Sequence, residues 1–390
     1  MKIEDVSVFR VGGRYDGPEF APGDRQSQQL DIYPDAAAGE PKAGKRDRIS
    51  ALYLQVTADD GASGLFGPIQ ETQAFVILKQ LRRFLIGRDP MATELLLDQM
   101  LRLDRHGRSG QFMTGVSPID CALWDLKGKA LGLPVYRLLG GPTRQTVSAY
   151  ASMLGNSIDP EKAAAAAVEC KEKGFTAQKW FFRYGPVDGQ EGLAKNLAMA
   201  EAVRNGVGPV YELMFDAFMG WDLTYATEMV RGLEPLKPTW MEEPLPPERV
   251  TELRKLRQAA RVPIATGEHV YTRWQVKELL LQEAVDVLQT DPDWTGGITE
   301  LLKICALASA FGVPVVAHGH SLLPALHVAA SQSPTTVPRV EYLIRGQETK
   351  QYFHKPIYRP DGGELALPDL PGLGLVLDEE KIEEREDLKY

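Results

Sequence analysis

The chain has 390 residues, of which 44% are hydrophobic and 25% charged, a balance typical of a soluble globular protein. Its 44 Lys and Arg residues are outnumbered by 53 Asp and Glu residues, so the formal net charge of −9 argues against nucleic acids and anionic membranes as partners. Lys303, Gly312 and Pro314 interrupt the most apolar stretch, and Glu4 and Asp5 lie where a signal peptide would be apolar. We therefore expect a cytoplasmic protein without a membrane span.

The first part of the chain has the pattern of a small α+β domain. Apolar alternation predicts strands, and helical periodicity predicts helices. The predicted strands are 3–11, 50–58 and 64–69, and the predicted helices are about 71–86, 92–104 and 114–131. Residues 13–48 form a loop of a length that is usually functional or disordered. We predict a capping domain over 1–130, to which residues 365–390 return.

From about residue 147, short apolar strands alternate regularly with amphipathic helices. The strands are VSAYASM, AQKWFF, ELMFDAF, TWMEEP, VPIATGE, VDVLQTD, VPVVAH and RVEYLI. They are apolar on both faces, as buried parallel strands are. Eight such units predict a (β/α) barrel over residues 131–364.

An ionisable residue stands at the end of seven successive predicted strands. These residues are Lys179, Asp216, Glu242, Glu268, Asp291, His318 and Glu341. From Asp216 onward the intervals are 26, 26, 23, 27 and 23 residues, one strand–helix unit each. Catalytic groups of such barrels lie at the carboxyl ends of the strands, so this pattern predicts one active site.

Three of these residues suit a metal ion. Asp216, Glu242 and Glu268 follow adjacent strands, and three carboxylates at close quarters repel one another unless a cation neutralises them. A ligand set made only of oxygen atoms favours Mg²⁺, completed by water and substrate oxygens. The alternative for any one of them is a salt-bridged loop carboxylate.

Asp291 and His318 end neighbouring strands and suit a general base. A carboxylate behind a histidine fixes its tautomer and raises its basicity. His320 is expected to line the pocket. Lys179 is expected to hydrogen-bond a substrate carboxylate or, alternatively, to form an ion pair with Glu212 or Asp216.

These residues resemble the enolase superfamily, mandelate racemase subgroup. The likeness rests on Asp216, W-M-E242-E-P, T-G-E268-H, Q-T-D291 followed by G-G-I-T-E-L, and A-H318-G. It extends over nearly the whole chain, and the stretches G-F-T-A-Q-K-W-F-F-R-Y-G-P-V-D-G and E-E-P-L-P-P are most similar to those of L-rhamnonate dehydratases. The resemblance implies an α+β cap on a modified (β/α)₇β barrel, one Mg²⁺ per active site and a homo-oligomer, from dimer to octamer. It also implies that Glu341 hydrogen-bonds the developing enediolate.

The implied reaction is the dehydration of an aldonate such as L-rhamnonate to a 2-keto-3-deoxy acid by a hydro-lyase. His318 would take the C2 proton while Mg²⁺ stabilises the enediolate. A syn elimination would let His318 itself protonate the departing C3 hydroxyl. Racemases of the subgroup carry a second lysine where this chain has Phe181, which favours elimination over racemisation.

Several further residues are expected to contact substrate. They are His269, Trp294, His320, Arg183 and Arg25. His269 could instead pack against the next helix. Two other functions stay open at this point: an epimerase, racemase or cycloisomerase that uses the same enediolate, and a non-catalytic metal-binding barrel.

Overall fold

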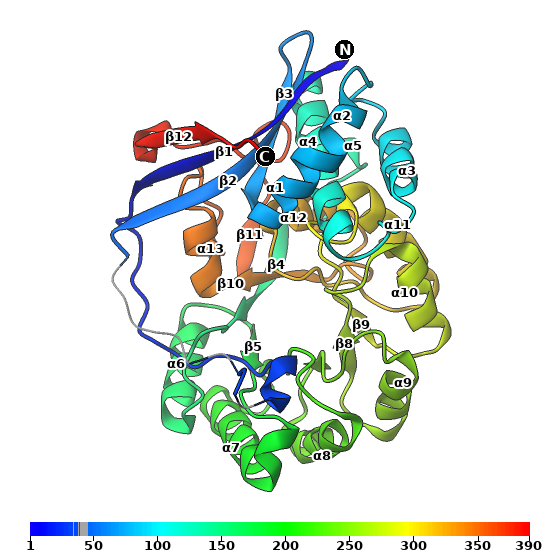
Figure 1. Ribbon diagram of the computed structural model, residues 1–390. Helices are drawn as coiled ribbons and strands as arrows, with labels where there is room; N and C mark the ends of the chain where they lie inside the picture. Colours follow the sequence, from blue (N-terminus) through cyan, green and yellow to red (C-terminus); the bar gives the residue numbers. More distant parts are fainter. Residues whose placement is uncertain (34, 38, 40–45) are drawn as a thin grey trace.

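The computed structural model describes residues 1–33, 35–37, 39 and 46–390. An antiparallel sheet of order β12-β1-β2-β3 and a curled, mostly parallel sheet form its two parts (Figure 1). The first sheet comprises β1 (Ile3–Arg14), β2 (Arg48–Ala58), β3 (Ser63–Ile69) and β12 (Glu384–Asp387). Because β12 pairs with β1, the end of the chain lies beside its beginning. The predicted boundaries between the two parts stay a prediction.

Helices cover one face of the antiparallel sheet. We call the sheet and these helices together the cap. They are α1 (Glu71–Val76), the π-helical segment η2 (Ile77–Leu81), α2 (Arg82–Leu85) and α4 (Gly110–Leu131). Two more helices pack on α4: α3 (Thr93–Leu103), which also contacts α11 (Gly297–Ala310), and α5 (Val135–Leu138), which also contacts α12 (Leu322–Ser331). Helix α4 is buried along most of its length and packs against β3. Its buried Asp120 accepts hydrogen bonds from the main-chain nitrogen and hydroxyl of Thr299, at 2.9 and 2.6 Å. These bonds attach the cap to the second part of the molecule.

The second part is the predicted barrel, with its helices on the outside of the curled sheet (Figure 1). Its strands are β4 (Thr146–Ser152), β5 (Ala177–Phe181), β6 (Glu212–Asp216), β7 (Trp240–Glu242), β8 (Ile264–Thr266), β9 (Val287–Leu288), β10 (Arg339–Leu343) and β11 (Glu364–Ala366). Its helices are α6 (Pro160–Glu172), α7 (Gly189–Val207), α8 (Leu223–Leu233), α9 (Val250–Ala259), α10 (Thr272–Leu281), α11 (Gly297–Ala310), α12 (Leu322–Ser331) and α13 (Ile344–Lys350). Four short 3₁₀ segments are η1 (Gln29–Ile32), η3 (Pro186–Asp188), η4 (Glu234–Leu236) and η5 (Glu379–Lys381). The predicted fold class is confirmed.

One predicted strand is shorter than expected. In VPVVAH only Val315 makes a bridge, parallel to Leu288 of β9. Pro314 has no N–H to donate, so the ladder is limited to Leu288 donating to the Pro314 carbonyl and Val316 donating to Leu288, at 3.0 and 2.8 Å. The segment still carries His318 to the same end of the sheet as its neighbours.

A layer of apolar side chains fills part of the barrel interior, one from each of the strands β4 to β9 and one from the segment that pairs with β9. This apolar layer comprises Tyr150, Ala177, Met214, Trp240, Ala265, Val287 and Val316, which form a buried cluster separate from the main core. Side chains two residues apart on a strand point to the same face. The next inward position on these strands is therefore Ser152, Lys179, Asp216, Glu242, Gly267, Gln289 and His318, which we call the polar layer.

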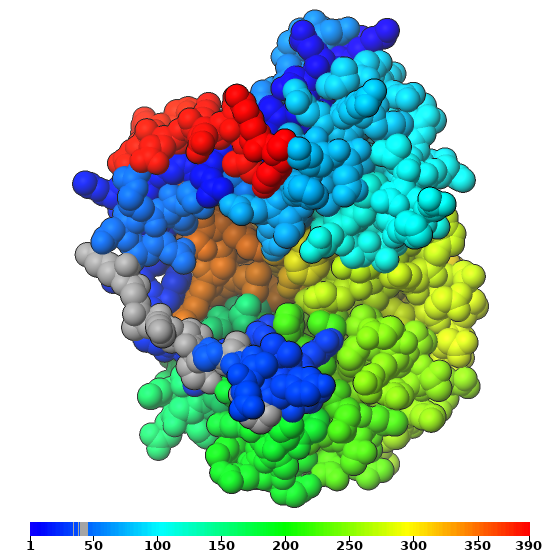
Figure 2. Space-filling model, in the orientation of Figure 1, coloured from blue at the N-terminus to red at the C-terminus, as the bar shows by residue number. Residues whose placement is uncertain are grey.

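The loop after β1 crosses from the cap to the barrel. Figure 2 shows the described part of this segment, in blue, lying on the green barrel residues. Ser27 attaches it there, since its main-chain nitrogen donates to the Phe182 carbonyl at 2.7 Å and its hydroxyl to the Ala217 carbonyl at 2.6 Å. Among the described residues, no helix is long and apolar enough to cross a membrane.

Candidate active site

A cavity of about 850 Å³ lies between the cap and the carboxyl ends of the barrel strands. The loop after β1 supplies Tyr15, Glu19, Phe20, Gln26 and Arg46 to its wall. The barrel supplies Phe181, Asp216, Glu268, His269, Trp294, His318 and His320, and the region around α13 supplies Leu343, Arg345, Thr349 and Lys350. Of the seven predicted strand-end residues, Asp216, Glu268 and His318 line this chamber. Lys179, Glu242, Asp291 and Glu341 are not among the described residues of its wall.

The three predicted metal ligands differ in whether they reach the cavity. All three are buried, but Asp216 and Glu268 line the cavity, whereas Glu242 is not among the described residues of its wall. Burial raises the pKa of Asp216 to about 6, of Glu242 to about 8 and of Glu268 to about 7. Carboxyl groups held in this way gain from a nearby cation, which offsets the cost of their burial.

Lys179 is buried among three carboxylates of the barrel interior. Its Nζ lies 3.3 Å from Asp216 and 3.1 Å from Glu341 and forms an ion pair with Glu242. Burial lowers the pKa of Lys179, but these carboxylates outweigh burial and raise the pKa above its usual value. Of the two ion pairs that the sequence left open, Asp216 is present, while Glu212 pairs with Arg339 at 2.8 Å.

Glu242 and Glu341 are each held by several donors. Glu242 Oε2 accepts hydrogen bonds from Trp240 Nε1 at 3.0 Å and from Gln289 Nε2 at 2.6 Å. Glu341 Oε2 accepts from the Gly319 main-chain nitrogen at 2.9 Å. Burial raises the pKa of Glu341, but the charges of Lys179 and His318 outweigh it and lower the pKa to about 2.

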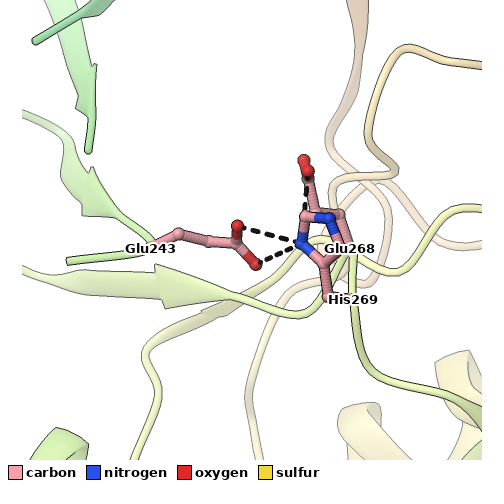
Figure 3. A group of neighbouring side chains, drawn as sticks. All are labelled: Glu243, Glu268 and His269. Atoms are coloured by element: carbon pink, nitrogen blue, oxygen red, sulfur yellow. Dashed lines mark hydrogen bonds and ion pairs between the residues drawn. The ribbon is translucent and has the colours of Figure 1, made fainter. Parts of the chain in front are cut away.

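A second acidic residue, Glu243, joins Glu268 and His269 in a group whose potential ligand atoms lie within 4.8 Å of one another (Figure 3). His269 Nδ1 is 3.1 Å from Glu243 Oε2 and 3.4 Å from Glu268 Oε1. Strand alternation would point Glu243 away from Glu242, but its φ of 40° turns the backbone at the strand end. Sequence reasoning therefore missed Glu243, for which the E-E-P doublet was the only signal.

His318 and Asp291 form the predicted dyad. His318 Nδ1 lies 3.0 Å from Asp291 Oδ2, and His318 Nε2 lies 3.2 Å from Glu268 Oε2. Burial lowers the pKa of His318, but Glu268, Asp291 and Glu341 outweigh burial and raise the pKa to about 10. Trp294 stacks on the His318 ring with centroids 5.0 Å apart.

Of the predicted substrate contacts, the structure brings three to the cavity. His269, Trp294 and His320 line it. Arg25 instead pairs with Asp31 through two contacts of 2.8 Å, and Arg183 Nη1 lies 3.9 Å from the same carboxylate. Neither arginine is among the described residues that line the cavity. Arg345 and Lys350, which do line the wall, lie in α13 directly after β10 and were missed.

Residues 162–381 match the family described as enolase C-terminal domain-like, and residues 43–140 match the mandelate racemase / muconate lactonizing enzyme N-terminal domain. The chain belongs to this enolase-like family. Its barrel and cap therefore correspond to the two domains of the enolase superfamily.

Relatives within the enolase superfamily include sugar-acid enzymes. An L-rhamnonate dehydratase of Saccharopolyspora erythraea is 34% identical over 97% of each chain. A rhamnonate dehydratase of Gibberella zeae, solved with Mg, is 31% identical with a TM-score of 0.83 over 98% of this chain and 96% of that one. A 3,6-anhydro-D-galactonate cycloisomerase of Zobellia galactanivorans is 28% identical with a TM-score of 0.79, over 98% of this chain and all of that one (100%).

Proposed function

We propose that this protein is a Mg²⁺-dependent acid-sugar dehydratase that converts an aldonate, L-rhamnonate or a close analogue, to its 2-keto-3-deoxy acid. The observation that carries the proposal is the His318–Asp291 dyad, which faces a cavity that also exposes Asp216 and Glu268. Similarity to two rhamnonate dehydratases over nearly the full chain supports the same chemistry.

The donor set fits a divalent cation. The buried carboxylates Asp216, Glu242, Glu243, Glu268 and Glu341 outnumber the cationic groups that contact them. We assign the ion to Asp216, Glu242 and Glu268, with Glu243 and His269 beside them. Carboxylate oxygens are the ligands that Mg²⁺ prefers. When bound, Mg²⁺ supplies Lewis-acid stabilisation of negative charge on the substrate carboxylate during enolisation.

The protein's own groups would perform the proton transfers. His318 accepts the C2 proton at Nε2, because its Nδ1 is held by Asp291 and cannot turn toward the cavity. Glu341 and Lys179, buried below, form the positioning layer that keeps His318 and the metal-binding carboxylates in place. Loss of the C3 hydroxyl then gives an enol, which tautomerises to the 2-keto-3-deoxy acid.

A cycloisomerase is the second candidate, because one similar solved structure has that activity. Epimerisation or racemisation needs a base on each side of C2, and Phe181, which lines the cavity, offers none. Elimination and cyclisation share the first proton transfer, so the product distinguishes them.

Proton NMR in D₂O tests the proposal. The protein with Mg²⁺ would be incubated with a panel of aldonates and aldarates that includes L-rhamnonate and 3,6-anhydro-D-galactonate. We expect a 2-keto-3-deoxy product with deuterium at C3. Deuterium at C2 without loss of water would indicate epimerisation, and a ring-altered isomer would indicate cycloisomerisation. The same panel with His318→Asn is the control for contaminating activity.

A further inference from the structure

A second histidine–carboxylate pair lies beside the first one. His320 Nδ1 lies 2.7 Å from Asp293 Oδ2 in an ion-pair contact without hydrogen-bond geometry, whereas His318 Nδ1 and Asp291 Oδ2 form a hydrogen bond of 3.0 Å. Both members of the second pair lie two residues after those of the first. Trp294 contacts both imidazoles, with ring centroids 5.0 Å from His318 and 4.9 Å from His320.

The second pair is held from several sides. Buried Asp293 accepts a hydrogen bond at Oδ1 from Gln73 Nε2 of the cap at 3.0 Å, and its main-chain nitrogen donates to Asp291 at 2.7 Å. The His320 main-chain nitrogen also donates to Asp291, at 3.1 Å, and Lys350 Nζ donates to the His320 carbonyl at 2.9 Å. These bonds fix the Asp293 carboxylate and the main chain of His320 from both domains, so the imidazole is held beside Asp293.

The contacts also distinguish the histidines that line the cavity. Glu268 touches His318, and Trp294 lies against three imidazoles, those of His318, His320 and His269, with ring centroids 5.0, 4.9 and 5.7 Å away. His269, by contrast, contacts Glu268 and Glu243, so it lies at the end where the metal is assigned. Of the two other histidines on this indole, His320 is the one whose described contacts include no assigned metal ligand. A substrate whose carboxylate lies at those ligands and whose C2 lies at His318 would therefore present C3 on the His320 side.

We propose that His320 is the general acid that protonates the departing C3 hydroxyl, with Asp293 as its positioning residue. This assignment rests on the proposed dehydratase function and replaces a single-histidine syn elimination. His318 takes the C2 proton, the C2–H electron pair forms the C2=C3 double bond, and the C3–O bond breaks. The oxygen leaves as water with the proton of His320 Nε2. Solvent then returns a proton to His320, and C3 takes one on ketonisation.

Two substrates separate the acid from the base. Fluoride leaves without the full protonation that hydroxide needs, and loss of HF from a 3-deoxy-3-fluoro aldonate gives the same keto acid. General acids typically contribute about 10²- to 10⁴-fold to the rate. For His320→Asn we expect kcat on the hydroxy acid to fall at least about 100-fold, because hydroxide needs the proton that His320 would supply. On the fluoro acid we expect kcat to stay within about 10-fold of wild type, because fluoride leaves without that proton.

His318→Asn is the matched control, because it removes the same ring from the neighbouring pair. It should be inactive on both substrates. His320→Asn in D₂O should also uncover exchange of the C2 proton on the hydroxy acid, as deprotonation continues without elimination. Asp293→Asn should show the same preference for the fluoro acid to a smaller degree, which a purely structural role would not produce.

The outcomes are distinct. Equal losses on both substrates in His320→Asn, repeated in His320→Gln, would overturn the assignment, as would unchanged turnover of the hydroxy acid. Wild-type protein that neither exchanges C2 nor eliminates water or fluoride from any acid would instead overturn the proposed function itself.

Discussion

The apolar and polar layers of the barrel come from the same strands, two residues apart, yet they contribute oppositely to the molecule. Met214 and Trp240 are buried in an apolar cluster, where burial of a large side chain stabilises the fold by roughly 1.5–3 kcal/mol. Asp216 and Glu242 are equally buried one step above, where burial disfavours their charged forms and raises their pKa. The apolar layer thus stabilises the fold, and the polar layer holds the ionisable groups that the proposed chemistry needs.

The largest effect that would test this contrast is on turnover. His318→Asn should lower kcat by about 10³-fold or more, since it removes the general base while leaving Asp291 a hydrogen-bonding partner. Circular dichroism and Mg²⁺ binding should be unchanged. A variant that still dehydrates the substrate at near wild-type rate would remove His318 from the mechanism.

Lys179→Met, measured without added metal, tests how far this lysine stabilises the buried carboxylates of the polar layer. The change leaves Asp216, Glu242 and Glu341 without the lysine that contacts all three. We therefore expect the free energy of unfolding, measured in urea, to fall by about 3–5 kcal/mol. The control is Lys173→Met, whose ion pair with Glu169 is exposed and should contribute at most about 0.5 kcal/mol. Equal stability of the two variants would contradict the contrast between the layers.

Met214→Ala probes the apolar layer directly below Asp216. Truncating this fully buried side chain should destabilise the fold by about 2–5 kcal/mol through lost burial and a cavity. The affinity for Mg²⁺, measured by calorimetry on the folded variant, should change by no more than a few-fold. A large loss of affinity with little loss of stability would mean that the two layers are not separable.

Histidines extend the comparison, because carboxylates raise the pKa of His318 whereas burial lowers that of His354 to about 4. The unfolded chain binds the His354 proton near pH 6.5 and the folded chain only near pH 4, so stability falls as pH drops between these values. His354→Phe should remove about 3 kcal/mol of this acid-induced loss. Urea unfolding at pH 7 and pH 4 measures it, with exposed His106→Gln as control; an unchanged pH slope would contradict the assignment.

The smallest expected effect distinguishes the metal ligand in the polar layer from its neighbour. With Glu242 as ligand and Glu243 as its neighbour, Glu243→Gln should weaken Mg²⁺ binding by about 10–100-fold, as outer-shell changes do. Glu242→Gln should weaken Mg²⁺ binding further. Calorimetric titration of both folded variants with Mg²⁺ measures the difference. The reverse order would make Glu243 the ligand.

The sequence by itself determined the barrel and the row of ionisable strand ends, because both follow from local periodicity. Buried parallel strands are continuous apolar runs, and the intervals from Asp216 to Glu341 repeat the length of one strand–helix unit. The confirmed fold class and the single chamber that collects Asp216, Glu268 and His318 follow from that repeat.

Tertiary structure decided what lies beyond the ends of the strands. The positive φ of Glu243 turns its side chain toward His269, Asp31 holds Arg25 at η1, and Gln73 of the cap secures Asp293 beside His320. None of these contacts has a sequence period, since each joins groups from a turn, a loop or another domain. Side-chain direction in such segments depends on long-range partners, which only the folded chain brings together.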